Sequence, residues 1–169
     1  MPRVWVSVGS NIERERHISA ALADLRETFG ELVVSPVYET DAVGFEGDAF
    51  FNLIVGFDTS LTPSALHGLM REIEAHHGRE RSGDKFAART LDLDLLTYGD
   101  AVTEEGGKAL PRDEILRYAF VLAPLADVAG DEMHPVLGES YSSLWERFAA
   151  SNPEGLRRLD NLPWLNESD

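Results

Sequence analysis

The sequence predicts an α+β domain built on a ferredoxin-like β-α-β-β-α-β antiparallel sheet with additional C-terminal helices. Its 169 residues fit one domain, without internal repeats or a linker. Apolar residues alternate in four short segments, as in strands, and recur at spacings of three and four in two segments, as in amphipathic helices. The order of these segments is the split arrangement of ferredoxin-like folds.

The first strand is predicted from the alternation of Val4, Val6 and Val8, and it ends at Gly9-Ser10-Asn11. A helix follows over 13–29, stopped by Gly30. Its apolar stripe consists of Ile18, Leu22, Leu25 and Phe29. These elements predict a sheet with at least one helix packed on it.

The second strand is predicted over 32–40, where Pro36 marks an edge or a bulge. After a glycine-containing acidic loop at 41–49, a third strand covers 50–59. Its alternation places Phe50 and Asn52 on one face, and the other face is formed by Phe51, Leu53, Val55 and Phe57. An aromatic ring beside an amide is typical of sites that bind a flat heterocycle, although both residues could equally serve packing and turn capping.

Thr62 and Pro63 are typical of a helix start, and Gly78 ends that helix. The fourth strand is predicted over 90–98 and is ended by Gly99-Asp100. With both helices on one face of the sheet, the other face stays free. We place Asp92 and Asp94 there, together with Phe50 and Asn52.

The remainder is predicted to cover part of the sheet. A polar connector at 111–118 leads to a helix over 119–129, with Pro124 near its first turn. Ser140 caps a last helix that Asn152-Pro153 stops, and Trp164 and Leu165 in the tail could dock on the body. We therefore treat 1–169 as one domain, with a core at 3–130 and a C-terminal helix and tail at 131–169.

The composition excludes several classes of function. With 30 acidic against 15 basic residues and a formal net charge of −15, nucleic acids and anionic membranes are not expected partners. The absence of cysteine excludes disulfides, thiol nucleophiles and cysteine metal sites. No signal-like or membrane-spanning apolar run is present, so we expect a cytoplasmic protein.

The segment 78–96, GRERSGDKFAARTLDLDLL, contains the strongest chemical signal. In a strand, Asp92 and Asp94 point to the same side and repel each other, which a divalent cation would relieve. Mg²⁺ is typically held by one or two carboxylates plus substrate phosphates. Upstream lie four cations within eleven residues, against Glu80 and Asp84, and they favour a polyphosphate. These cations are Arg79, Arg81, Lys85 and Arg89.

Two alternatives stay open from these residues alone. A D-x-D strand can be a solvated edge, and arginine-rich loops are commonly solvated. Glu74, His76 and His77 end the preceding helix next to this loop. The histidines suit a helix C-terminus, whereas Glu74 is delivered to the mouth of the loop and is the better candidate for nucleotide binding.

The motifs at Gly78-Arg79, at Arg81 and at Arg89–Leu96 (RTLDLDLL) resemble the 6-hydroxymethyl-7,8-dihydropterin pyrophosphokinases of folate biosynthesis. The likeness extends from Gly9-Ser10-Asn11 to Pro124-Leu125. The resemblance implies the ferredoxin-like core and transfer of pyrophosphate from ATP to the pterin hydroxymethyl group, with release of AMP. The implied partners are ATP and the pterin, and we expect a monomer.

The resemblance also implies roles for individual residues. Asp92 and Asp94 match the pair that binds two Mg²⁺ ions, and Arg79, Arg81 and Arg89 match catalytic loop positions. The implied pterin-binding residues are Thr40, Val43, Phe50, Asn52 and Phe120. Phe86, Arg112 and Arg117 are implied as nucleotide-binding residues, and we add Glu74 and Lys85 from their positions at and in the basic loop.

The sequence departs from the family pattern at several positions, including Tyr118, where an arginine is usual, and Asp41-Ala42, where prolines are common. Phe86-Ala87-Ala88-Arg89 stands where W-G-P-R is usual, and Pro111-Arg112 where Pro-His is usual. Arg112 could still meet a phosphate as a fixed cation. These departures leave a second class open, a paralogue that binds pterin or nucleotide as a sensor or partner protein. The D-x-D pair leaves a third class open, a metal-dependent phosphohydrolase.

Overall fold

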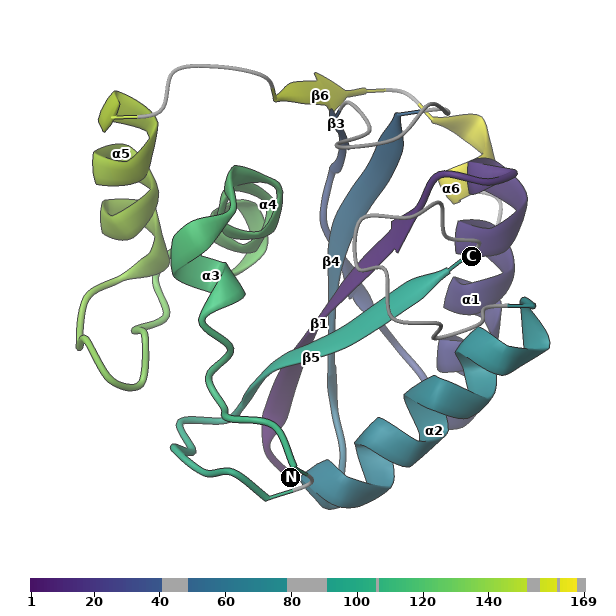
Figure 1. Ribbon diagram of the computed structural model, residues 1–169, viewed down its shortest axis with the longest axis horizontal. Helices are drawn as coiled ribbons and strands as arrows, with labels where there is room; N and C mark the ends of the chain where they lie inside the picture. Colours follow the sequence, from purple (N-terminus) through teal and green to yellow (C-terminus); the bar gives the residue numbers. More distant parts are fainter. Residues whose placement is uncertain (41–48, 79–90, 106, 152–155, 161, 167–169) are drawn as a thin grey trace.

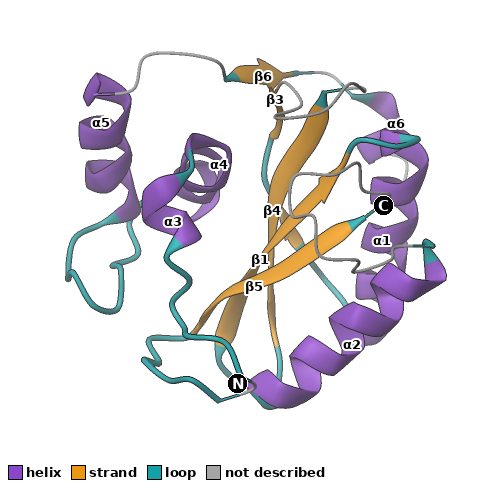
Figure 2. Cartoon of the chain, in the orientation of Figure 1, coloured by secondary structure: helices purple, strands orange, loops and turns teal. Residues whose placement is uncertain are grey.

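The computed structural model describes residues 1–40, 49–78, 91–105, 107–151, 156–160 and 162–166. An antiparallel sheet forms the middle of the molecule (Figures 1 and 2). Its pairing order is β5-β1-β4-β3-β6, and β2 also pairs with β4. The strands are β1 (Arg3–Ser10), β2 (Val33–Val34), β3 (Val37–Thr40), β4 (Phe50–Asp58), β5 (Asp92–Tyr98) and β6 (Arg157–Leu159).

The first face of the sheet is covered by α1 (Arg14–Phe29) and α2 (Pro63–His76), as predicted (Figure 1). The short α6 (Pro163–Asn166) lies on the same side. Thr62 caps α2 by accepting a hydrogen bond from the Ala65 N–H at 3.2 Å, as the Thr-Pro sequence predicts. The sheet side of this core includes the four alternating residues Phe51, Leu53, Val55 and Phe57.

The second face is partly covered by α4 (Ala119–Ala129), with α3 (Glu114–Arg117) and α5 (Tyr141–Ser151) packed on α4. Trp5, Ile54 and Leu96 form the sheet side of this second core. The Trp5 indole N–H donates to Glu132 at 3.1 Å, which joins β1 to the segment after α4. The C-terminal third of the chain thus packs on the sheet, as its apolar periodicity predicts.

Three details differ from the sequence prediction. The predicted strand at 32–40 is divided into β2 and β3, because Ser35 and Pro36 interrupt it and the Ser35 hydroxyl accepts from the Ile54 N–H at 2.8 Å. Pro124 lies at the sixth residue of α4 rather than in its first turn. The predicted connector contains α3, and the predicted tail contains β6 and α6.

The tail docks on the body as predicted. Trp164 and Leu165 pack against the first core, and β6 pairs with β3. Among the described helices, none is long and apolar enough to cross a membrane.

Candidate functional site

A row of three residues crosses the second face of the sheet. Asn52 on β4 pairs with Gly9 on β1, and Gly9 pairs with Asp92 on β5. Residues that are paired in an antiparallel sheet project to the same side. Two strand spacings of about 4.8 Å place the Asn52 and Asp92 backbones roughly 10 Å apart. The predicted heterocycle-binding amide and the predicted metal-binding carboxylate therefore share one face, separated by a glycine.

Asp92 and Asp94 project from β5 on this same face. Asp94 pairs with Ser7, two residues before the Gly9–Asp92 pair, so both carboxylates alternate with the buried Leu93 and Leu95. Burial raises the pKa of Asp94 to about 6, and the negative charge of Asp92 contributes to the same shift. The carboxylate pair is thus electrostatically strained in the way that a bound cation relieves.

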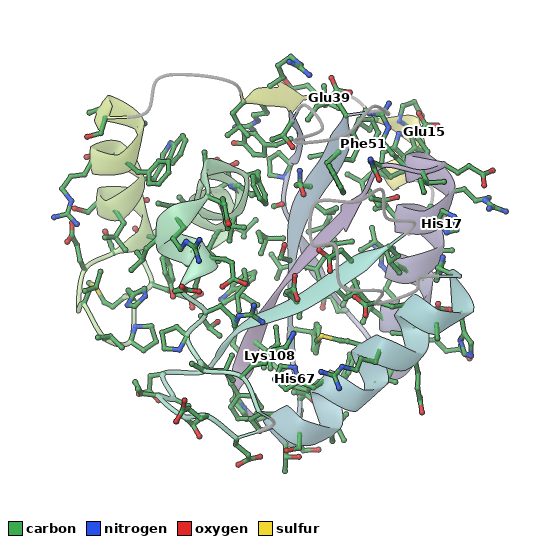
Figure 3. The ribbon with its side chains drawn as sticks, viewed as in Figure 1. Glu15, His17, Glu39, Phe51, His67 and Lys108 are labelled. Carbon is green, nitrogen blue, oxygen red and sulfur yellow. The ribbon has the colours of Figure 1, made fainter. Side chains whose placement is uncertain are left out.

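Positive charge lies close to Asp94. Arg112 Nη1 lies 3.9 Å from Asp94 Oδ1, and Arg112 also forms an ion pair with Glu114. The charges of Arg112 and Lys108 both lower the pKa of Asp94 without overcoming burial. Lys108 comes from the segment after β5 and lies beside His67 of α2 in Figure 3. The structure thus brings the predicted Arg112 to the carboxylate pair and adds a cation that no motif indicates.

Glu74 is held against β5. Its side chain is buried, and its Oε2 accepts a hydrogen bond from the backbone N–H of Leu93 at 2.8 Å. Leu93 lies between the two aspartates, and β5 is an edge strand of the described sheet. Glu74 therefore satisfies the N–H of the residue between the two aspartates, a contact that the sequence does not predict.

The other end of the row contains the predicted heterocycle-binding residues. Asn52 is buried, and its Nδ2 donates to Thr40 Oγ1 at 3.1 Å. Thr40 pairs with Phe50, which places both on the face of Asn52. A Cβ at Gly9 would lie 3.0 Å from Asn52 Oδ1. Thr40, Phe50 and Asn52 are thus brought together, and the space beside the Asn52 amide depends on Gly9.

Two further predicted residues lie near the start of α4. Phe120 belongs to its first turn and stacks on Tyr118, with ring centroids 5.0 Å apart. Arg117 is half-exposed, forms an ion pair with Asp113 at 3.3 Å and lies over the Tyr118 ring. These contacts tie Arg117 to α3 and to Tyr118, whereas Arg112 is the nearer cation to Asp94.

Six predicted site residues lie outside the described residues. They are Val43, Arg79, Arg81, Lys85, Phe86 and Arg89. The departure from the family pattern at Phe86-Ala87-Ala88 lies there as well.

The donor set of the described residues suits a hard cation. These residues contain no cluster of three or more histidine or carboxylate side chains that could hold a metal ion by itself. Asp92 and Asp94 supply two carboxylates, and Mg²⁺ is typically completed by water and substrate phosphates. The raised pKa of Asp94 shows that burial and the charge of Asp92 disfavour its ionised form, which a bound cation would stabilise. The site therefore fits Mg²⁺ delivered with a polyphosphate.

Comparisons with known proteins point to one family. Residues 5–130 match the family model described as 7,8-dihydro-6-hydroxymethylpterin-pyrophosphokinase (HPPK). The 2-amino-4-hydroxy-6-hydroxymethyldihydropteridine pyrophosphokinase of Pseudomonas aeruginosa is 35% identical over 161 residues, covering 93% of this chain and 96% of that protein. The folic acid synthesis protein fol1 of Pneumocystis carinii is 34% identical over 147 residues, covering 85% of this chain.

The fold also matches solved structures. The wild-type HPPK-DHPS protein of Plasmodium falciparum superimposes with a TM-score of 0.72 at 12% identity, covering 95% of this chain. The present chain spans 48% of that structure's chain and 20% of the Pneumocystis protein. It thus corresponds to one part of these longer proteins and to nearly the whole of the Pseudomonas protein.

Proposed function

Because the chain belongs to the 7,8-dihydro-6-hydroxymethylpterin-pyrophosphokinase family, we propose that it transfers pyrophosphate from ATP to 6-hydroxymethyl-7,8-dihydropterin with the residues of the row Asn52–Gly9–Asp92. The reaction releases AMP and belongs to folate biosynthesis. The row carries the proposal, because it sets a heterocycle-binding amide and a carboxylate pair on one face, roughly two strand spacings apart.

The pterin end of the site is assigned to Asn52, Thr40 and Phe50, with Phe120 on α4 and with Val43. The Asn52 carboxamide offers both a donor and an acceptor to the amide edge of the pterin. Gly9 leaves the space beside this carboxamide open, because any side chain there would crowd Asn52 Oδ1. The hydroxymethyl group then points along the row toward Asp92.

The phosphate end is assigned to Asp92 and Asp94, which would hold Mg²⁺, with two ions expected when ATP is bound. Mg²⁺ supplies charge neutralisation of the phosphates and alignment of the attacking hydroxyl. Arg112 and Lys108 add positive charge beside Asp94. Glu74 contributes by fixing the backbone of β5 between the two aspartates. Lys85, Phe86 and Arg117 complete the proposed nucleotide contacts.

The transfer itself requires positioning rather than covalent participation of the protein. The pterin hydroxyl oxygen attacks the β-phosphorus in line, the new O–P bond forms, and the bond to the α-phosphate oxygen breaks to release AMP. Arg79, Arg81 and Arg89 are proposed to stabilise the negative charge that spreads over the transferred group.

We propose further that the core is ferredoxin-like, which the pairing order β5-β1-β4-β3 supports. We also propose that the enzyme is a monomer in the cytoplasm and that it binds neither nucleic acid nor membranes. Size-exclusion chromatography with light scattering would test the monomer, and a dimer would contradict it.

The deciding experiment separates nucleotide products by chromatography after incubation with ATP and Mg²⁺, with and without the pterin alcohol. AMP that forms only when the pterin is present supports the proposal. Release of inorganic phosphate without the pterin would indicate a phosphohydrolase. Pterin binding without AMP formation would indicate a sensor, and either result would overturn the proposal.

A further inference from the structure

Arg14, the first residue of α1, joins two chain positions that are ten residues apart. Its Nη1 donates to Glu39 Oε2 at 3.0 Å and to the backbone carbonyl of Ala49 at 2.8 Å. Glu39 lies near the end of β3, and Ala49 directly precedes β4. The side chains of Arg14 and Glu39 are only 24% and 23% exposed, so this ion pair is partly shielded from water. One guanidinium thus links the paired ends of the two strands at this end of the sheet.

The same guanidinium packs on an aromatic ring. The Arg14 Cζ lies 3.8 Å from the centroid of the Phe51 ring, a close cation–π contact. Phe51 is also parallel to Trp164 of α6, with ring centroids 6.1 Å apart. Glu39 in turn accepts from Arg157 of β6 at 3.1 Å. Figure 3 shows Glu39 and Phe51 at the end of the molecule where α1 begins. Arg14, Glu39, Phe51, Arg157 and Trp164 therefore form one cluster, the Arg14 cluster, which connects β3, β4 and the C-terminal segment.

This cluster lies directly behind the proposed pterin residues. Glu39 and Phe51 are register partners, and their side chains project from the first face of the sheet. The next pair along, Thr40 and Phe50, projects from the second face, as does Asn52. A shift of Glu39 or Phe51 would move the backbone from which Thr40, Phe50 and Asn52 project. The geometry of the pterin edge thus depends on contacts made on the opposite side of the sheet.

We propose that Arg14 is a positioning residue for pterin binding, acting through Glu39, Ala49 and Phe51. It does not touch the substrate. It holds the ends of β3 and β4 at the spacing that lets the Thr40 and Asn52 side chains meet the pterin together. This inference rests on the proposed function, since it assigns the pterin to the Asn52 end of the row.

The test compares Arg14→Met with Arg14→Lys, and uses Arg16→Met as a matched control. Methionine keeps an unbranched, flexible side chain that can still pack near Phe51, but it ends short of the guanidinium position and removes the charge and the donors. Lysine keeps the charge but lacks the planar fork. Arg16 lies on the same helix, is 67% exposed and pairs only locally with Glu13 among its described ion pairs. Steady-state kinetics would give the KM for the pterin at saturating MgATP, the KM for ATP at saturating pterin, and kcat, alongside the melting temperature.

For Arg14→Met, the KM for the pterin should rise about tenfold, which corresponds to about 1.4 kcal/mol of binding free energy. The KM for ATP should stay within about twofold, because Asp92, Asp94 and Arg112 are separated from the cluster by Gly9 and roughly two strand spacings. Arg14→Lys should give an intermediate KM, and Arg16→Met should match the wild type.

Two outcomes would overturn the inference. One is an unchanged KM for the pterin in folded Arg14→Met. The other is a parallel rise of the KM for the pterin and the KM for ATP that accompanies a lower melting temperature and that Arg14→Lys does not reverse. That result would indicate a purely structural role. The wild type separates the two proposals. If the wild type forms no AMP, the proposed function fails. If the wild type is active and Arg14→Met has the same KM for the pterin, only the role of Arg14 is overturned.

Discussion

The carboxylate of Glu74 accepts a hydrogen bond from the backbone N–H of Leu93 at 2.8 Å, so a buried side chain of α2 holds the peptide between Asp92 and Asp94. β5 is an edge strand of the described sheet, and its outward N–H groups lack a neighbouring strand. The position of the two aspartates thus depends on α2 as well as on the sheet.

Replacing Glu74 by alanine should therefore lower both stability and metal affinity. The unpaired Leu93 N–H should cost about 1–3 kcal/mol of unfolding free energy, measured by urea denaturation. The Mg²⁺ concentration needed for half-maximal activity should rise as well. Glu74→Gln keeps an acceptor oxygen and should retain most of the stability and most of the metal affinity. Equal losses in the two variants would show that the charge matters rather than the hydrogen bond.

Asp94→Asn should stabilise the metal-free protein while abolishing activity. The pKa of Asp94 is raised to about 6 by burial and by Asp92, so the folded protein holds this proton to a higher pH than the unfolded chain does. The wild type therefore loses stability as the pH rises from about 4 to about 6, and the loss persists above that range.

The gain for Asp94→Asn at pH 8 should be about 1–3 kcal/mol in unfolding free energy, measured in EDTA. Saturating MgATP should remove this advantage, because the wild-type carboxylate then has its cation. A variant that is less stable than the wild type in EDTA would contradict the assigned strain.

Gly9→Ala should weaken pterin binding selectively. The added Cβ would lie 3.0 Å from Asn52 Oδ1, so the carboxamide must move by a few tenths of an ångström. We expect the KM for the pterin to rise about tenfold, equivalent to about 1.4 kcal/mol, with the KM for ATP nearly unchanged.

Gly68→Ala on α2 is the matched control for that variant. A Cβ there meets nothing within 4 Å, and alanine favours a helix over glycine by about 1 kcal/mol. This variant should melt higher and keep both KM values. If Gly9→Ala also leaves the KM for the pterin and the KM for ATP unchanged, pterin binding does not depend on the present orientation of Asn52.

His17 should contribute stability that is lost in mild acid, opposite in sign to the effect of Asp94. Burial lowers the pKa of His17, and the charges of His77 and Arg16 lower it further, against an opposing effect of Glu13. Nδ1 of His17 lies 2.7 Å from Nδ1 of His77, whose Nε2 faces Asp24. The unfolded chain binds a proton at His17 below pH about 6.5 while the folded protein resists it, so stability is lost as the pH falls.

His17→Gln should flatten this dependence by up to about 1.4 kcal/mol per pH unit between pH 6.5 and 5, measured by urea denaturation. His76→Gln, at an exposed position of α2, is the control and should leave the slope unchanged. The buried His67 and His134 also have lowered pKa values and should account for part of the remaining slope. An unchanged slope in His17→Gln would contradict the role of the histidine pair.

The sequence predicts the elements that obey a simple period. The helices α1, α2, α4 and α5 and the alternation in β1, β4 and β5 follow from apolar spacing and from caps such as Thr62 and Ser140. The shared face of Asp92 and Asp94 follows from the period of a strand. These features are local, so local chemistry determines them.

What the sequence does not predict depends on partners far along the chain. The break at Ser35 depends on Ile54, and the contact of Glu74 depends on the edge of β5. The charge of Lys108 acts on Asp94 from a segment without a motif, and β6 pairs with β3 from far along the chain. No period or spacing in one segment encodes such pairings.

The stacking of Trp164 on Phe51 gives the protein a spectroscopic reporter at the proposed pterin end. The chain has three tryptophans, and the other two, Trp5 and Trp145, belong to the second core. Replacing those two by phenylalanine would leave one indole, whose emission reports on the Arg14 cluster from behind the substrate face. Substrate-induced movement of β3 and β4 could then be followed by stopped-flow fluorescence without any attached dye.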